Sequence, residues 1–213
     1  MEKFVVTVQR QFGSMGRRIA RRMSELLGVR YYDREIVDAA AEKLNLPVST
    51  VRDEEEKAEQ QPRSAFSIMQ YPLGKGTSDT QDKIFAVQKN IIRMCAKEGN
   101  CVIVGRCADF ILSDLDSAMH IYIYAPYETR VRICVEELKF SEEEARHMIR
   151  EIDKARRCYH MHYAGCLADD TRYKDILIDS SFLGVEGTAE YLADAVRRKF
   201  GSVQDRHGIV QNK

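Results

Sequence analysis

Five short runs of apolar residues, separated by stretches with helical spacing, set the strongest limit on how this chain can fold. The clearest run is 101–104, which is apolar throughout, as is typical of a strand buried on both faces of a parallel sheet. The other runs fall at 4–8, 29–32, 119–125 and 175–179. Strands that alternate with helices predict βαβ units. We therefore predict one α/β domain over residues 1–201 and a disordered tail at 202–213.

Two segments depart from this alternation. Residues 53–82 contain an acidic run, two of the four prolines and a Gly-Lys-Gly sequence, so we predict a mobile insertion there. Residues 140–170 begin with Ser141 and Glu144 at the spacing of a capping box and continue as a long charged helix. The second segment is predicted to form a helical lid.

The overall charge excludes a general attraction to polyanions. Thirty-three basic and thirty-three acidic residues balance, which argues against nucleic acid or an anionic membrane as partner and makes any phosphate site a local one. No apolar run approaches the roughly 20 residues that a membrane span needs, and no signal-peptide pattern is seen. These features predict a cytoplasmic protein with reduced cysteines.

A glycine-containing loop follows the first predicted strand and precedes a helix that ends at Gly28. Backbone N–H groups of such a loop, at residues 13–16, can hold phosphate oxygens together with the helix N-terminus. Against the pattern G-x-x-x-x-G-K-[ST], Gly16 matches the second glycine, Arg17 stands at the lysine and Arg18 at the hydroxyl that binds magnesium. The alternative is an ordinary glycine turn.

Basic side chains elsewhere could complete a phosphate site. Five charged residues gather near the end of the charged helix, either as a solvated face or as cations for a phosphoryl transition state. They are Arg150, Asp153, Lys154, Arg156 and Arg157. Asp33 and Arg34 follow the second predicted strand, where Arg34 could meet an acceptor phosphate or where the pair could simply cap a surface helix. Arg106 directly follows the buried run and Gly105, which favours a position facing the ligand crevice.

Taken together, the chain resembles the cytidylate kinase-like branch of the nucleoside monophosphate kinases, a P-loop family. The resemblance runs from about Val5 to Tyr191 and is carried by the segments 10–20, 32–35, 102–109, 153–157 and 178–181. It implies an α/β P-loop NTPase fold, a three-layer sandwich with about five parallel strands, a helical lid and a mobile insertion. It also implies a phosphotransferase that uses ATP and Mg²⁺ on a small molecule, most simply a nucleoside monophosphate such as CMP.

The resemblance assigns roles by position. The residues implied to hold ATP phosphates are Gly13, Ser14, Met15, Gly16, Arg17 and Arg18. The catalytic residues implied are Arg17 with Asp153, Arg156 and Arg157 of the lid, and those implied on the acceptor side are Asp33, Arg34, Arg106 and Asp109. Arg18 cannot ligate Mg²⁺ as a hydroxyl does, so water, another side chain or the nucleotide must hold the metal, with Asp33 and Asp109 as two alternatives.

Three other interpretations compete with an active kinase. The degraded Lys-Ser/Thr pair suggests a nucleotide-binding sensor that keeps the fold without turnover. Residues 39–52 have the cadence of a helix-turn-helix, but an acidic run follows them and phosphate would repel it. Cys158, His160, His162 and Cys166 could be zinc ligands, yet their spacing is not a standard one, and a thiol face with surface histidines is the simpler interpretation.

Overall fold

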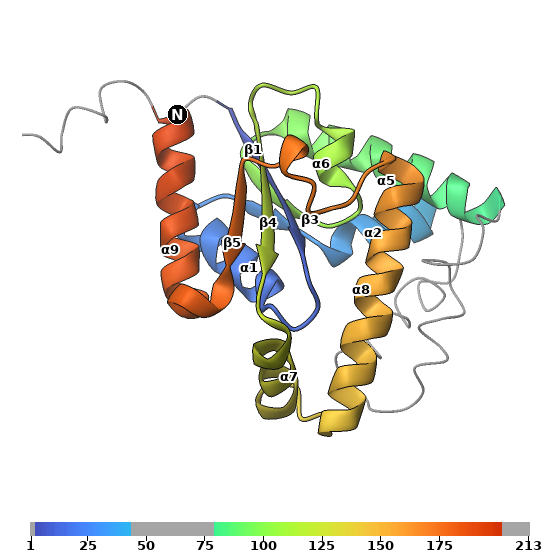
Figure 1. Cartoon of the computed structure of the whole chain (residues 1–213). Coiled ribbons are helices and arrows are strands. Elements are labelled where there is room, and N and C mark those ends of the chain that lie inside the picture. The colour runs from blue at the N-terminus through green and yellow to red at the C-terminus, as the bar shows by residue number, and fades with distance from the viewer. Residues whose placement is uncertain (1–2, 44–78, 202–213) are drawn as a thin grey trace, which may run out of the picture.

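The computed structural model describes residues 3–43 and 79–201 and shows a parallel five-stranded sheet with helices on both faces (Figure 1). The strands are β1 (Val5–Arg10), β2 (Arg30–Tyr32), β3 (Cys101–Val104), β4 (Ala118–Tyr124) and β5 (Ile176–Asp179). They run in the order β2-β3-β1-β4-β5, and every neighbouring pair is parallel. The predicted five-stranded α/β sheet is confirmed.

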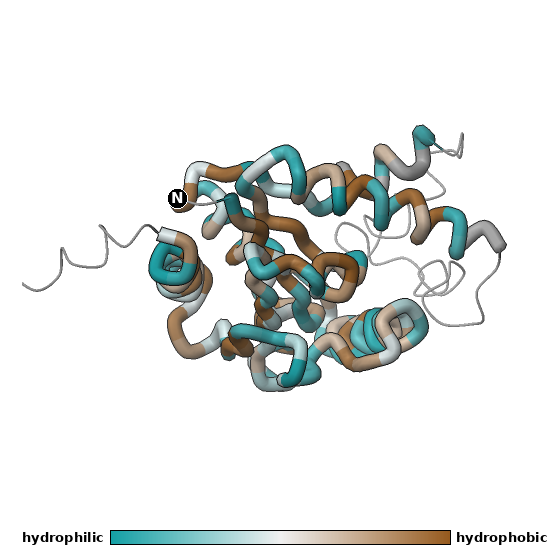
Figure 2. Tube along the Cα trace, turned by 90° about the horizontal axis from the view of Figure 1, so that it is seen from above, coloured by the Kyte–Doolittle hydropathy of each residue, from teal (hydrophilic) through white to brown (hydrophobic). Residues whose placement is uncertain are grey.

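The helices are α1 (Gly16–Leu27), α2 (Arg34–Lys43), α5 (Asp79–Glu98), α6 (Ala108–Ile111), α7 (Tyr127–Glu136), α8 (Glu142–Ala164) and α9 (Ser180–Phe200), with a short 3-10 turn η1 (Thr171–Tyr173). One core cluster joins α1 and α9 to one face of the sheet, and a second joins α2, α5 and α6 to the other face. Figure 2 shows hydrophobic stretches gathered at the centre of the molecule, between the outer helices. This is the three-layer arrangement that the sequence predicts.

Local signals explain where several helices begin and end. Helix α1 ends at Gly28, which adopts a left-handed conformation with φ 65° that glycine accepts without steric cost. Helix α8 begins with the predicted capping box, because Ser141 and Glu144 exchange side-chain to backbone hydrogen bonds. Helix α9 starts at Ser180 and bends at Gly184, whose φ and ψ are not helical.

Some sequence predictions fall wholly or partly outside the described residues. The predicted insertion at 53–82 does so for residues 53–78, while residues 79–82 belong to the first turn of α5. The predicted tail at 202–213 and most of the helix-turn-helix interpretation at 39–52 also lie outside them. Within 3–43 and 79–201, no helix combines the length and the apolar character needed to cross a bilayer.

Candidate active site

The carboxyl ends of β1, β3 and β4 meet at one edge of the sheet. The loop after β1 is joined to the end of β4, because Gln11 N donates to Ile123 O over 3.0 Å and Ala125 N donates to Gln11 Oε1 over 3.2 Å. Gly105 N, after β3, donates to Val8 O of β1 over 3.0 Å. Ligands of open α/β sheets bind at this edge.

The glycine-containing loop is tightly held. Met15 adopts φ 57° and α1 starts at the next residue, so the turn from strand to helix closes over residues 11–15. Ser14 is buried, and its hydroxyl donates to Gln11 O over 2.9 Å, while Ser180 Oγ donates to Ser14 O over 2.7 Å. A Cβ at Gly13 would lie 3.0 Å from Cys134 Sγ, so the loop packs against α7 without room for a side chain.

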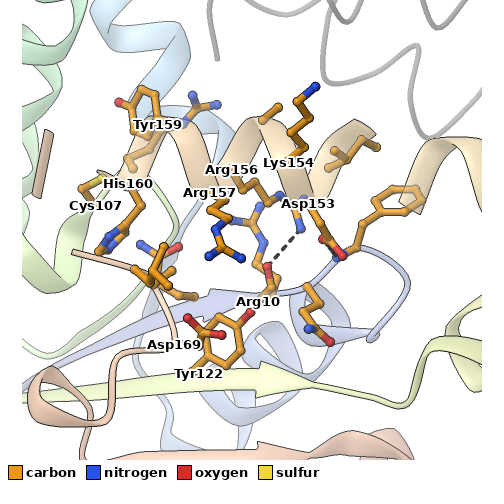
Figure 3. Close-up of a pocket in the computed structure, with 18 of the residues that line it drawn as sticks. Arg10, Cys107, Tyr122, Asp153, Lys154, Arg156, Arg157, Tyr159, His160 and Asp169 are labelled. Carbon is orange, nitrogen blue, oxygen red and sulfur yellow. Dashed lines mark hydrogen bonds between the residues drawn. The ribbon is translucent and has the colours of Figure 1, made fainter. Parts of the chain in front are cut away.

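A cavity of about 400 Å³ opens between this edge and α8 (Figure 3). In the figure, side chains of α8 reach toward Arg10, Tyr122 and Asp169 on the opposite wall. The charged lining residues are the cations Arg10, Arg17, Arg106, Lys154, Arg156 and Arg157 and the carboxylates Asp153 and Asp169. Among the described lining residues, cations outnumber carboxylates, so this part of the cavity suits a ligand with several negative charges.

Arg17, at the position of the pattern's lysine, lines the cavity and pairs with a carboxylate. Its Nε lies 2.5 Å from Asp33 Oδ2, and Asp33 also accepts a hydrogen bond from Tyr31 Oη over 3.2 Å. Burial raises the pKa of Tyr31, and the Asp33 carboxylate raises it further, so the phenol stays protonated and donates to Asp33. The positive charge of Arg17 is thus partly neutralised by the Asp33 carboxylate.

Helix α8 is attached directly to the glycine-containing loop. Asp153 Oδ1 accepts a hydrogen bond from Phe12 N over 2.8 Å, and Asp153 Oδ2 lies 2.5 Å from Arg130 Nη1. Arg130, from α7, also donates to Phe12 O and Ala125 O. Arg156 Nη1 donates to Arg10 O over 3.1 Å. A loop amide of this chain therefore already faces an anion, the carboxylate of Asp153.

The turn after β3 places Arg106 in the cavity through an unusual backbone. Gly105, Arg106 and Cys107 adopt φ values of 76°, 56° and 52° in succession. For residues with a side chain, this left-handed conformation costs about 1–2 kcal/mol each, and such strain gathers at functional sites. The strained turn directs Arg106 to the lining, as the sequence predicts, while Cys107 is buried and burial raises its thiol pKa.

A buried ionic network lies behind the cavity wall. Asp109 is 3% exposed, and its carboxylate accepts hydrogen bonds from Gln9 Nε2 (2.8 Å) and Lys174 Nζ (2.6 Å) and contacts His160 Nε2 (3.0 Å). His160 Nδ1 contacts Cys166 O over 2.8 Å. Gln9 and His160 themselves line the cavity. Asp109 therefore positions two lining residues without lining the cavity itself.

The network shifts the pKa values of both ionisable partners. Burial alone would raise the pKa of Asp109, but the His160 hydrogen bond and the Lys174 charge outweigh it, so the pKa falls well below its ordinary 3.8. Burial would lower the pKa of His160, but the Asp109 hydrogen bond and charge raise it above its ordinary 6.5 despite the nearby Lys174. The folded state thus favours the charged pair.

These shifts predict that the Asp109–His160 pair contributes most to the free energy of unfolding in mildly acidic solution. The contribution of His160 to the free energy of unfolding is complete below pH 6.5 and is lost as pH rises through its raised pKa in the folded state. The contribution of Asp109 is present above pH 3.8 and is lost as pH falls through its lowered pKa in the folded state. Urea unfolding of wild type and His160→Gln between pH 5 and 9 tests this. We expect the stability advantage of the wild type to shrink with rising pH.

The informative quantity in that experiment is the difference in free energy of unfolding between the wild type and His160→Gln. Burial lowers the pKa of His120, which contributes an opposite slope to both proteins and cancels in the difference. A constant difference across the whole pH range would contradict a charged His160.

The structure brings some predicted site residues together and separates others. Arg17, Arg106, Asp153, Arg156 and Arg157 share one cavity. Gly13, Ser14, Met15 and Gly16 form the turn beside it without lining it, and Asp33 joins it through Arg17. The side chain of Arg34 lies outside what the structure describes.

Two predicted site residues lie elsewhere. Arg18 is 59% exposed in its side chain and pairs with Glu137 on α7, because it stands roughly 100° further round α1 than Arg17. Asp109 was expected on the acceptor side, but three partners hold its carboxylate behind the wall. Neither residue lines the cavity in this structure.

The interpretation of the Cys158 to Cys166 cluster as a partly buried thiol face with surface histidines is wrong for His160, although His162 is exposed. His160 is buried against Asp109 rather than exposed, whereas Cys158 is exposed. Cys166 lies beyond Gly165, at which α8 ends, and so does not continue the helical face of Cys158 and His162. Across the described parts of the chain, no cluster of three or more His, Cys, Asp or Glu side chains has metal-binding geometry.

The residues present do not reproduce the magnesium position of the P-loop pattern. Arg18 stands where the pattern has a hydroxyl, and the nearby Ser14 hydroxyl is buried and donates to Gln11 O. Asp153 and Asp169 are the carboxylates in the lining, and Asp153 is bound to Arg130. Among the described lining residues, Asp169 is the carboxylate that could join phosphate oxygens and water around a magnesium ion bound with a nucleotide.

Comparisons with known proteins agree with this geometry. The structure is similar to an uncharacterized protein from Eubacterium ventriosum (TM-score 0.65, 24% identity, 94% of this chain and 99% of that one). It is also similar to TT1252 from Thermus thermophilus (0.51, 14%, 94% and 99%) and to the shikimate kinase from Bacteroides thetaiotaomicron (0.50, 10%, 91% and 98%). These likenesses show the fold of P-loop kinases.

No curated protein matches the sequence. The family comparison is decisive, because residues 5–182, most of the chain, match the model of the cytidylate kinase-like family. The match spans the glycine-containing loop, the turn after β3 and all of α8. The chain therefore belongs to the cytidylate kinase-like family.

Proposed function

We propose that the protein is an ATP-dependent phosphotransferase acting on a small molecule, with a nucleoside monophosphate such as CMP as the first candidate acceptor. The observation that carries this proposal is the cavity in which Arg17, Arg106, Arg156 and Arg157 converge beside the glycine-containing loop. Phosphoryl transfer requires little covalent chemistry from a protein and depends on positioning and on cations around the transferred group. Membership of a kinase-like family supports the same reaction class.

In the proposed reaction, an acceptor oxygen attacks the γ-phosphorus of ATP. The bond from that phosphorus to the β–γ bridging oxygen breaks, and ADP leaves with the electron pair. Gly13 to Gly16 and Arg17 are proposed to hold the donor phosphates, with Arg106, Asp33 and Arg34 on the acceptor side. Magnesium, when bound with ATP, neutralises phosphate charge.

Helix α8 is proposed to act as the lid. Arg156 and Arg157 already line the cavity, so closure can bring them to the equatorial oxygens of the transferred group. Asp153 accepts the Phe12 amide, a position that a phosphate oxygen could take. Donor binding is therefore proposed to displace Asp153 from Phe12 and to shift α8 on the loop.

A panel of acceptors tests the proposal. Purified protein is incubated with ATP-Mg²⁺ and CMP, dCMP, UMP, AMP, GMP or non-nucleotide alcohols, and ADP and phosphorylated product are measured together. We expect one acceptor to give stoichiometric ADP and product. A variant with both Arg156→Ala and Arg157→Ala serves as the control for contaminating kinases and should lose most of that activity.

A nucleotide-binding sensor is the second candidate, favoured by the Arg17–Asp33 pair and by the outward position of Arg18. A sensor would bind ATP and release no ADP with any acceptor. Calorimetric ATP binding without turnover across the panel would establish the sensor and reject the phosphotransferase.

A further inference from the structure

We propose that Arg10, the last residue of β1, is a phosphate-binding residue and supplies the central cation of the cavity. This inference rests on the proposed function, because it concerns the phosphate groups of that ligand. In the P-loop pattern this charge comes from the lysine after the second glycine, whereas Arg10 comes from the strand on the other side of the loop.

Two glycines make room for the Arg10 side chain. A Cβ at Gly16 would lie 2.7 Å from Arg10 Cβ, and a Cβ at Gly105 would lie 2.5 Å from Arg10 Nη1. Real Cβ atoms do not approach heavy atoms so closely, so a side chain at either position would displace Arg10. Arg10 therefore runs from the start of α1 to the turn after β3, along the edge where ligands bind.

This path lies between the donor and acceptor sides of the proposed site. Gly16 opens α1, whose N-terminus attracts phosphate, and Gly105 precedes Arg106. Arg10, Arg17 and Arg106 all line the same cavity. A guanidinium group in this position can reach phosphate groups from both sides.

The positive charges of Arg10 and Arg17 both act on the hydroxyl group of Tyr31. Burial is the main cause that raises the pKa of Tyr31, followed by Asp33, while the positive charges of Arg17 and Arg10 both oppose that rise. The two guanidinium groups are thus close to one hydroxyl. Asp33 pairs with Arg17 at 2.5 Å, and the described lining of the cavity carries six cations and two carboxylates. A ligand with several negative charges suits such a lining.

The backbone around Arg10 is held by two hydrogen bonds. Arg156 of α8 donates to Arg10 O, and the next residue, Gln11, donates to Ile123 O. Figure 3 shows Arg10 directly beneath Arg156 and Arg157. A cation fixed before the ligand arrives stabilises the ligand without the cost of reorganisation. The contact to Arg156 also couples the position of the lid helix to that of Arg10.

Calorimetry with ATP and with inorganic pyrophosphate tests the inference on wild type, Arg10→Met, Arg10→Lys and the matched control Arg198→Met. Arg198 is 70% exposed, pairs with Asp194 on α9 and does not line the cavity. We expect Arg10→Met to weaken binding of both ligands by about 10- to 100-fold, the loss of a charge-assisted hydrogen bond. Arg10→Lys should recover part of the affinity, because it restores the charge without the planar fork. Arg198→Met should bind as the wild type does.

A double-mutant cycle separates the effect of displacing the Arg10 side chain from a general effect of the substitution on folding. Gly105→Ala pushes a Cβ into Arg10 Nη1 and should weaken pyrophosphate binding in the wild type but much less in Arg10→Met. The backbone strain of alanine at φ 76° is common to both backgrounds and cancels. Thermal unfolding of each variant identifies those that remain folded.

The outcomes distinguish this inference from the proposed function. Equal pyrophosphate affinity in folded Arg10→Met and wild type would overturn the inference alone. Arg10-dependent pyrophosphate binding without turnover of any acceptor would support the inference and reject the phosphotransferase. A wild-type protein that binds neither ATP nor pyrophosphate would overturn both.

Discussion

Gly16→Asp is expected to abolish detectable ATP binding while the protein remains folded. Gly16 opens α1, so a carboxylate there would stand at the helix end whose amides are proposed to face phosphate, and like charges repel. The Cβ of the introduced aspartate would lie 2.7 Å from Arg10 Cβ and would force the Arg10 side chain aside. Calorimetric titration of ATP into the purified variant gives the result directly.

Two further variants separate these causes. Gly16→Ala adds the Cβ without the charge, so it should weaken ATP binding less than Gly16→Asp does. Gly28→Asp adds the same charge at the other end of α1, where no atom lies within 4 Å and an aspartate tolerates φ 65°. It should bind ATP as the wild type does. Unchanged ATP affinity in folded Gly16→Asp would remove the phosphate-loop interpretation.

Structural features that depend only on residues close together in the sequence were predictable from the sequence. The apolar run 101–104 became the fully buried β3, Gly28 ended α1, and the Ser141–Glu144 pair capped α8. Each signal is contained within a few residues, because strand burial, left-handed caps and capping boxes are local requirements. The fold class follows from the order of such elements.

Contacts between distant segments were not predictable in this way. Asp109, His160 and Lys174 come from α6, α8 and the segment before β5, and nothing near His160 in the sequence indicates that it is buried. A helical pattern with a histidine every second residue favours solvent exposure, and tertiary pairing with a carboxylate overrode it. The short helix α6 was missed for a different reason, since four residues are too few to show a helical pattern.

The candidate site was predicted only in part. The lining residues Arg17, Arg106, Arg156 and Arg157 were singled out because each stands beside a strand end or in a dense charged run. Arg130 lies in a helix that looks amphipathic and ordinary, yet it donates to Phe12 O and pairs with Asp153. Tyr122 and Asp169 are lining residues that also carry no local pattern, while Gln9 and Arg10 adjoin the glycine-containing loop but were assigned no role. Only the folded sheet edge brings them together.

Arg17→Ala is expected to reduce turnover by about 30- to 1000-fold, a loss of ~2–4 kcal/mol in the barrier, and to reduce ATP affinity less. The loop amides would still hold the ground-state phosphates, but the charge that develops near the β–γ bridge would lose a cation. Removal of Arg17 also takes this cation away from the buried Asp33 carboxylate, which adds repulsion toward an incoming phosphate. Steady-state kinetics on the acceptor that the panel identifies give kcat and KM separately.

Arg18→Ala and Arg17→Lys make that experiment decisive. Arg18→Ala should have a much smaller effect, because Arg18 is exposed and its pair with Glu137 is a surface ion pair worth at most about 1 kcal/mol. Arg17→Lys should rescue part of kcat. An ammonium group supplies the positive charge, but unlike the planar guanidinium group it cannot direct separate N–H groups to Asp33 and to a phosphate at the same time. An equal or larger defect in Arg18→Ala would mean that the loop is aligned one residue out of register. A full rescue by lysine would mean that charge alone, and not the shape of the guanidinium group held by Asp33, is what the site requires of Arg17.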